Sequence, residues 1–365
     1  MVAGALSVRA DVTVYASQGP EVRRFTDGVF SVVELGTDSD ERTESERKLA
    51  GLEYLASRAQ ARSLIAGIGS EPGRLATLVG RDALEHWSRA ESLVAEAQPD
   101  LVVLADYQQM GAARLAASLW PGTPVVVLPL VPSGASALVP SFAGTFKEAR
   151  LALVFTEDER RVVEGVTDIP VARVALPIAS NASVLRAPHE QVGERHYIAV
   201  VTGAPLHAPS SSASQAMLLV SRFPDHVIAV CATDALGVFG DGAARVSESV
   251  GRGTDLLRLM AWATATVDLR PGPVYARRCL QSLVHGTPVL VPAATRGREH
   301  AQLGRCGLWF DGPTEFLRAT DALLTPPVSE VLGRQSAGYV AQWCRSSEGF
   351  VDDIFSSLRG AVDLF

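Results

Sequence analysis

The sequence has few of the features that mark secreted or membrane proteins. Its 365 residues include only 4 cysteines, and no two of them stand at the short spacing of a zinc site or a disulfide framework. We therefore expect reduced, buried thiols. The longest uncharged stretch, residues 115–146, is interrupted by prolines, whereas a membrane helix needs about 20 unbroken apolar residues. The start, MVAGALSVRADVTVYA, lacks the basic region of a secretory signal.

Positive charge is also scarce. The chain carries 33 basic and 40 acidic residues, a net charge of −7, and only Lys48 and Lys147 are lysines. Nucleic-acid surfaces depend on clustered Lys and Arg, so this balance argues against that class of partner and predicts that any anion site is local. We expect a cytoplasmic protein, and leave open a peripheral association with a membrane or with a partner enzyme.

What is present is the composition of a soluble α/β protein, with 47% hydrophobic and 20% charged residues and 31 glycines. The length suits two domains rather than one core. We expect an N-terminal Rossmann-like domain over 1–176, a connection over 177–195 and a C-terminal domain over 196–345. A C-terminal helix, 346–365, would be able to pack back on the first domain.

Short apolar runs rich in β-branched residues alternate with stretches of helical spacing along both halves. Strands alternating with helices are typical of parallel βαβ units, so we predict two Rossmann-like halves with parallel sheets. The expected strands are 11–16, 100–105, 123–130 and 151–156, then 196–203, 226–233, 244–249, 265–269 and 287–292. The expected helices are 41–66, 82–97 and 111–120, with two more over 336–365.

The stretch RPGPVYARRCLQSLVHGTPVLVPAA, residues 270–294, has the pattern of a helix that runs through a Gly-Thr-Pro corner into a buried strand. Its polar residues are all basic or neutral. WPGTPVVVLP in the first half repeats the corner, which we interpret there as architecture alone.

Together with the flanking ATATVDL and TRGREHAQLGRCGLWFDGPTEFLRATDALL, the second corner resembles the donor site of the GT-B fold glycosyltransferases of the retaining "group 1" family. The resemblance implies two Rossmann-like domains facing across a cleft and a nucleotide-sugar donor bound by the C-terminal domain. We expect no metal, since no Asp-x-Asp follows an expected strand, and no cofactor apart from the nucleotide sugar as substrate.

The chain departs from that family where the family is most recognisable. Its pair of glutamates, one contacting the donor sugar and the other the ribose, falls on Pro273 and Gln281. The Gly-Arg and Lys-Gly that bind the diphosphate are replaced around Gly203 and His207. Gln281 would still hydrogen-bond a ribose hydroxyl, although without the charge of a carboxylate.

Other residues supply candidates for the missing functions. A helix starting near Val274 would direct free N–H groups at a phosphate, and Arg270, Arg277 and Arg278 are candidate cations, with solvated or structural arginines as the alternative. Arg278, Gln281 and His285 are expected to share a polar stripe. The remaining donor-side candidates are Tyr275, Arg298 and Glu299, of which Glu299 matches an acid of the family.

On the acceptor side, Asp106 follows an expected strand, and we take it with Glu299 as a candidate catalytic residue. The sequence thus predicts a glycosyltransferase that moves a sugar from a nucleotide diphosphate to a glycan or lipid-linked acceptor, as in polysaccharide biosynthesis. The alternative is a GT-B-like protein that no longer catalyses and serves as a binding or scaffold partner of an active transferase.

Overall fold

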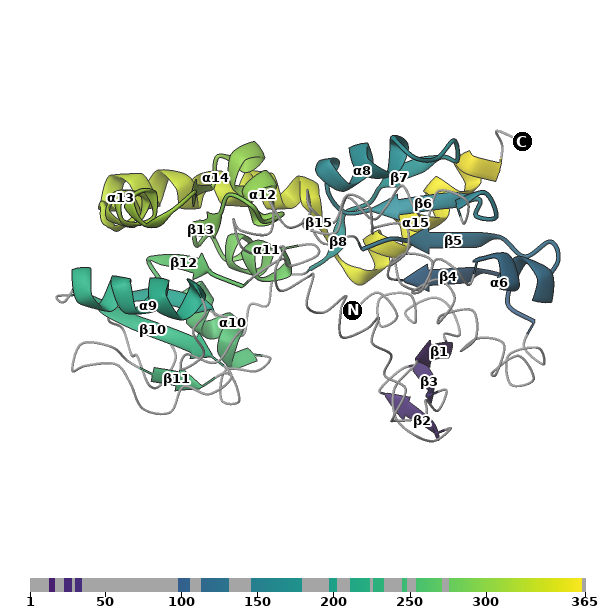
Figure 1. Cartoon of the computed structure of the whole chain (residues 1–365), viewed down its shortest axis with the longest axis horizontal. Helices are drawn as coiled ribbons and strands as arrows, with labels where there is room; N and C mark the ends of the chain where they lie inside the picture. Colours follow the sequence, from purple (N-terminus) through teal and green to yellow (C-terminus); the bar gives the residue numbers. More distant parts are fainter. Residues whose placement is uncertain are drawn as a thin grey trace, which may run out of the picture. The chain divides into compact units, whose positions relative to one another are not determined.

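The structure is a computed structural model of the whole chain, drawn in Figure 1. Its described residues fall into twelve ranges. These are 13–16, 23–27, 30–34, 98–105, 113–130, 146–178, 197–201, 211–223, 226–232, 245–247, 254–270 and 276–362. The expected helices 41–66 and 82–97 lie outside them.

The chain divides into two compact units. The first comprises Met1–Pro177 and Arg345–Phe365, and the second comprises Ile178–Cys344. The chain thus passes from one unit to the other twice. Two short strands, β8 (Leu176–Pro177) and β15 (Cys344–Arg345), pair with each other as a two-stranded sheet.

The first unit contains a four-stranded parallel sheet of order β4-β5-β6-β7. Its strands are β4 (Val102–Ala105), β5 (Val125–Leu128), β6 (Leu151–Val154) and β7 (Val171–Arg173). Strands β5 and β6 are buried along their whole length, as expected where helices cover both faces of a parallel sheet.

A separate three-stranded sheet of order β1-β3-β2 lies earlier in the chain. Its strands are β1 (Thr13–Ala16), β2 (Arg23–Asp27) and β3 (Phe30–Glu34). Strand β3 pairs parallel with β1 and antiparallel with β2, a hairpin that the sequence pattern did not predict.

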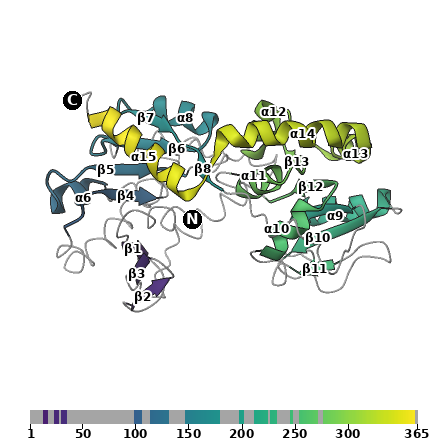
Figure 2. The same ribbon diagram turned by 180° about the vertical axis from the view of Figure 1, so that it is seen from behind.

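The helices that the structure describes in the first unit are α6 (Ala113–Leu119), α8 (Glu157–Glu164) and α15 (Ser347–Val362). Helix α15 comes from the C-terminal end of the chain, yet it lies beside β6 and β8, as the views from both sides show (Figures 1 and 2). The rings of Phe155 and Phe350 stack there, with centroids 6.4 Å apart.

The second unit is built on one six-stranded parallel sheet of order β11-β10-β9-β12-β13-β14. Its strands are β9 (Tyr197–Val201), β10 (Val227–Ala232), β11 (Arg245–Ser247), β12 (Ala265–Asp268), β13 (Val289–Pro292) and β14 (Gly307–Phe310). Numbered within the unit, the order is 3-2-1-4-5-6, which is that of the dinucleotide-binding Rossmann fold.

Six helices accompany this sheet in the described part of the second unit. They are α9 (Ser211–Arg222), α10 (Thr254–Ala261), α11 (Arg277–Val284), α12 (Gly297–Gly304), α13 (Pro313–Leu324) and α14 (Pro326–Trp343). The Gly-Thr-Pro corner after α11 approaches α14 closely, because a Cβ on Gly333 would lie 2.5 Å from the carbonyl oxygen of Gly286. Only a glycine fits at that point of α14.

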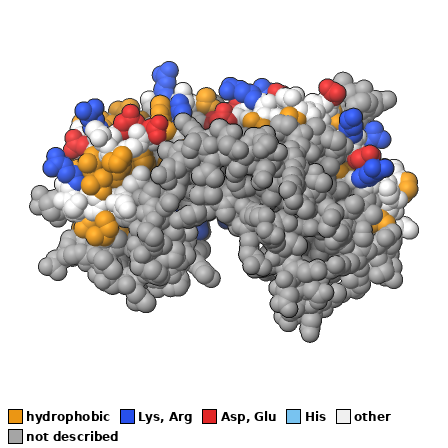
Figure 3. All heavy atoms as spheres, in the orientation of Figure 1, with side chains coloured by type: hydrophobic (Ala, Val, Ile, Leu, Met, Phe, Trp, Pro, Cys, Tyr) orange, Lys and Arg blue, Asp and Glu red, His pale blue; other side chains and the backbone are white. Residues whose placement is uncertain are grey.

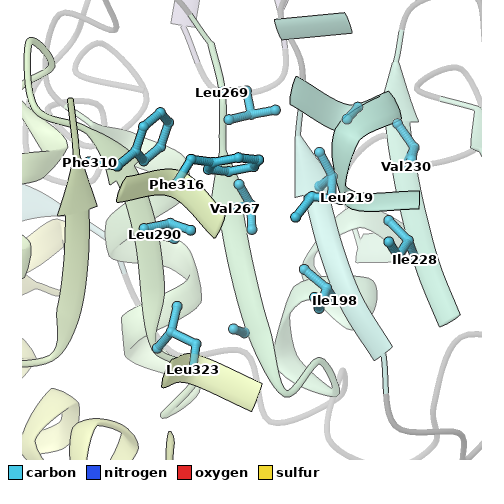
Figure 4. Packing of buried hydrophobic residues seen from close by; sticks show 13 residues of the cluster. Ile198, Leu219, Ile228, Val230, Val267, Leu269, Leu290, Phe310, Phe316 and Leu323 are labelled. Carbon is cyan, nitrogen blue, oxygen red and sulfur yellow. The ribbon is translucent and has the colours of Figure 1, made fainter. Parts of the chain in front are cut away.

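One face of the sheet carries a core that spans five strands and two helices (Figure 4). Phe310 at the end of β14 packs against Phe316 of α13, with ring centroids 4.7 Å apart. Ile198, Val267 and Leu290, from three different strands, lie in the same cluster. This packing holds the strands in place relative to one another, and so determines where each strand ends and the following loop begins.

The structure has a strand within each predicted strand range, and the described strands are one to four residues shorter than those ranges. The expected helix 111–120 corresponds to α6, and two helices, α14 and α15, cover most of 336–365. Helix α14 begins earlier than the apolar spacing indicated, at Pro326, where a proline in the first turn suits a helix start.

Candidate functional site

The strand order of the second unit locates a crevice. The chain moves from β9 toward β10 on one side and from β12 toward β13 on the other, so neighbouring strands β9 and β12 flank the point where the winding reverses. In open parallel sheets, ligands bind outside the carboxyl ends of the strands at this switch point. The loops after β9, β12 and β13 therefore define the region to search.

A buried ion pair ends β12. Asp268 is only 3% exposed, and its two carboxylate oxygens accept from Arg270 Nε at 2.8 Å and from Arg270 Nη2 at 2.6 Å. The carboxylate also accepts from the backbone N–H of Arg270 at 3.2 Å. Such a bidentate pair fixes the guanidinium in one orientation and matches its charge. The proposed role of Arg270 as a diphosphate cation stays a prediction, and this pair argues against it.

Helix α11 begins later than predicted. The sequence suggested a start near Val274, but Ala276 has φ 49° and ψ 37°, a left-handed conformation that cannot continue into a right-handed helix, so α11 begins at Arg277. Within the described residues no side chain caps this N-terminus, and the first turn holds no acidic residue. It holds Arg277, which is exposed, and Arg278, which is half-buried.

The first two residues of the predicted polar stripe on α11, Arg278 and Gln281, are in contact. Arg278 Nη1 donates a hydrogen bond to Gln281 Oε1 at 3.0 Å, one turn along the helix. Gln281 is 7% exposed. Because a guanidinium can only donate, the atom that faces it must be the amide oxygen, and the orientation of the Gln281 amide follows from chemistry.

The third member of the stripe lies at the other end of the helix. His285 caps α11 at its C-terminus, and burial lowers its pKa. Its ring stays neutral over a wider pH range than a solvated histidine, so it adds no cation to the stripe at neutral pH.

The loop after β13 leads directly into α12 and brings three charged residues to the same edge of the sheet. Arg296 precedes the helix and is 4% exposed, Arg298 is exposed, and Glu299 is half-buried in the first turn. The guanidinium carbon of Arg298 lies 5.6 Å from the centre of the Trp309 ring on β14, a cation–π contact. Within the described residues no side chain caps α12 either.

The cysteines of this region behave as the sequence predicted. Cys279, Cys306 and Cys344 are free and buried. Burial raises the pKa of Cys306 to about 12 and raises that of Cys279 as well, so neither supplies a thiolate at neutral pH. They are packing residues rather than nucleophiles.

Several predicted site residues lie outside the described part of the chain. These are Asp106, Gly203, His207 and Tyr275. Among the predicted site residues that the structure describes, Arg270, Arg277, Arg278, Gln281, Arg298 and Glu299 all belong to the segments that follow β12 and β13. Sequence reasoning missed Asp268, although an aspartate at a strand end two residues before an arginine is a signal for such a pair.

Two searches of the described residues returned nothing. No helix there is both long and apolar enough to cross a membrane. No group of three or more His, Cys, Asp or Glu side chains there is arranged to hold a metal ion. On the face seen in Figure 3, described acidic and basic side chains are interspersed rather than gathered into one basic surface.

Comparison with known proteins gives a result in structure but not in sequence. No protein-family model matches the sequence, and no curated protein matches it significantly. Many solved structures do match, although their sequences are only distantly similar.

One is an alpha,alpha-trehalose-phosphate synthase (UDP-forming) from Burkholderia xenovorans in complex with glucose-6-phosphate. It has a TM-score of 0.66 at 11% identity, over 98% of this chain and 95% of that one. Sucrose-phosphate synthase from Thermosynechococcus elongatus also gives 0.66, at 10% identity over 100% and 92%. The glycosyltransferase SnogD from Streptomyces nogalater gives 0.53, at 17% identity over 78% and 82%. The match over nearly the whole length, together with the two Rossmann-like units, shows that this chain has the GT-B fold.

Proposed function

We propose that the protein is a glycosyltransferase that takes a sugar from a nucleotide-diphosphate donor held by the second unit. The named neighbours support this choice, since one is UDP-forming and a related structure contains UDP-2-fluoro glucose. A glycan or a lipid-linked molecule is the acceptor that we propose. We further propose a role in the cytoplasm, with peripheral membrane or partner-transferase association as the alternative.

The observation that carries the proposal is the pair of helix starts beside the switch point. Helices α11 and α12 both begin at the carboxyl edge of the parallel sheet without a side-chain cap among the described residues. Their first turns and caps hold Arg277, Arg278, Arg296 and Arg298. A cation at a helix N-terminus opposes the helix dipole, so this arrangement is unfavourable for the protein alone and favourable once an anion binds.

The chemistry of sugar transfer needs such a site. When the bond from the sugar to the diphosphate breaks, negative charge grows on the departing phosphate, and fixed N–H groups and guanidinium groups stabilise that charge in the transition state. Glu299, in the first turn of α12, is the acid that we propose to contact the donor. Asp106 remains our candidate on the acceptor side.

A second function has a specific observation in its favour. Two positions where the resembled family carries glutamates hold Pro273 and Gln281, and Arg270 is already paired with Asp268. A GT-B-like protein that retains a ligand site without catalysis, and acts as the partner of an active transferase, would tolerate these changes.

Ligand-induced thermal shift with a panel of nucleoside diphosphates tests the proposal. A ligand at a hundredfold excess over its Kd stabilises the native state by about 2.7 kcal/mol, so a true donor nucleotide raises the melting temperature measurably. Release of nucleoside diphosphate from the matching nucleotide sugar then separates a transferase from an inactive binder. Absence of any shift across the panel would reject the donor site and favour the scaffold.

A double variant locates the site. Arg277→Ala with Arg278→Ala is expected to weaken nucleoside diphosphate binding strongly. Arg318→Ala with Arg334→Ala removes the same charge from exposed positions on α13 and α14 and is the matched control. Equal affinity of the two double variants would show that the nucleotide binds elsewhere.

A further inference from the structure

Two arginines near the switch point have hydrogen-bond partners of different charge. Arg270 is held bidentately by Asp268, a buried carboxylate. Arg278 is held by Gln281 through one hydrogen bond of 3.0 Å to a neutral amide. Asp268 therefore brings a negative charge to its arginine, and Gln281 brings none.

The side chain of Gln281 is buried. At 7% exposure it lies among Cys279, Leu280, Ser282 and Leu283, all buried residues of the same helix. A buried polar side chain is costly unless it is hydrogen-bonded, and the bond to Arg278 is the one that the described residues provide for its oxygen. The position of Arg278 is thereby tied to a fixed point of α11.

The geometry of α11 places this pair on the side of the crevice. Cys279 Sγ lies 4.0 Å from the carbonyl oxygen of Gly297, so Cys279 is on the side of α11 nearest α12. At about 100° per residue, Arg278 and Gln281 are turned away from that side. Helix α12 packs on β13 and β14, and α11 also contacts α10, the helix that leads into β12. We take the side turned away from α12 as the side of the switch point, because β9 lies on the opposite side of β12 from β13.

We infer that Gln281 is a positioning residue that holds the Arg278 guanidinium for the diphosphate of the donor, and that its neutrality is required for this role. The inference rests on the proposed function and assigns the diphosphate cation within it. A carboxylate at position 281 would place a negative charge about 3 Å from the group that binds the anion, whatever else Arg278 contacts. The resemblance of the sequence implies the reverse, because it assigns a ribose-binding glutamate to this position.

Gln281→Glu therefore distinguishes a residue that positions Arg278 from a residue that contacts the ribose, because the two roles predict opposite changes in nucleoside diphosphate affinity. We expect this variant to bind inorganic pyrophosphate and the nucleoside diphosphate more weakly than the wild type, by on the order of tenfold or more. Restoration of a ribose contact would instead strengthen nucleoside diphosphate binding and leave pyrophosphate, which has no ribose, unchanged. Isothermal titration with both ligands measures the two effects.

The matched control is Gln302→Glu, which makes the same chemical change at an exposed position on the neighbouring helix α12. It is expected to leave both affinities within about twofold, because solvent and salt screen an exposed charge. Gln281→Met, a neutral variant of similar size, is expected to lose less affinity than Gln281→Glu, since it removes only the anchor of Arg278.

An electrostatic cause has a signature that damage to the fold lacks. The loss in Gln281→Glu is expected to be larger for a nucleoside diphosphate than for the corresponding monophosphate, because the repulsion grows with the charge of the ligand. Equal losses for both ligands would overturn the inference, as would wild-type affinity for pyrophosphate. A wild-type protein that binds neither pyrophosphate nor any nucleotide removes the proposed function, and the inference with it. Nucleotide binding that Gln281→Glu does not weaken removes the inference alone.

Discussion

Helices α8 and α11 both follow a strand of a parallel sheet, one in each unit, and their N-termini are opposite in character. In α8 the Oγ of Thr156 accepts from the backbone N–H of Glu159 at 3.2 Å, and the Glu159 carboxylate accepts from the backbone N–H of Phe155 at 3.1 Å. The first turn also holds Glu157 and Asp158. The N–H groups and the positive end of the dipole are thus satisfied by the chain itself.

In α11 the equivalent position is Ala276, whose methyl group cannot accept a hydrogen bond, and the next two residues are arginines. The chain itself satisfies the N-terminus of α8, whereas no side chain among the described residues does so for α11. A helix start with neither cap nor acid, at the carboxyl edge beside a switch point, is where an external anion contributes most. The comparison can be tested by altering each side of it.

The largest effect is expected from Asp268→Asn, which leaves Arg270 without its charged partner. Breaking a buried ion pair costs about 3–5 kcal/mol, and we expect about 2–3 kcal/mol here, because the Arg270 side chain keeps 22% of its exposure. Urea denaturation measures the loss, with the exposed Asp321→Asn as the control. Pyrophosphate affinity should be retained or increased, since a negative charge is removed. A stable variant that no longer binds pyrophosphate would place Asp268 or Arg270 in the ligand site instead.

An intermediate effect is expected at the capped N-terminus of α8. Glu159→Ala leaves the buried N–H of Phe155 without its acceptor, and we expect a loss of about 1–3 kcal/mol in the free energy of unfolding. Glu164 lies at the exposed end of the same helix and forms a surface ion pair with Arg160 Nε at 3.7 Å. Glu164→Ala should therefore lower the free energy of unfolding by well under about 1 kcal/mol. Similar losses in the two variants would show that the cap does not stabilise α8, and the contrast with α11 would lose its meaning.

Sequence patterns predicted most strands of the parallel sheets, missed the edge strands β7 and β14 and the hairpin β2–β3, and did not reveal how the charged side chains pair. Strands such as β5 and β13 are continuous β-branched runs next to a Gly-Thr-Pro corner, so period and punctuation identify them directly. The hairpin β2–β3 escaped because both strands are short and RRFTD has a single apolar residue, so it shows neither alternation nor an apolar run.

The site residues show a different limit. The spacing of Arg278 and Gln281 on one helix predicted their contact, because helical neighbours are fixed by the period alone. Nothing in the spacing distinguished Arg270 from Arg278, and only the side-chain geometry showed that one is held by a carboxylate and the other by an amide. The late start of α11 likewise depends on the backbone angles of a single residue, Ala276.

The smallest effect is expected from giving α11 the kind of first turn that α8 has. Arg277→Glu places an acid beside the free N–H groups of an exposed helix start, and we expect it to stabilise the protein by about 0.3–1 kcal/mol at low salt while it weakens pyrophosphate binding. A gain in stability together with a loss of pyrophosphate affinity would show that the introduced carboxylate and the pyrophosphate compete for the same helix N-terminus. Denaturation midpoints and pyrophosphate titrations at low and high salt measure both quantities. If Arg277→Glu left both unchanged, the field of the helix N-terminus would have no part in binding, and the arginine side chains alone would have to hold the anion.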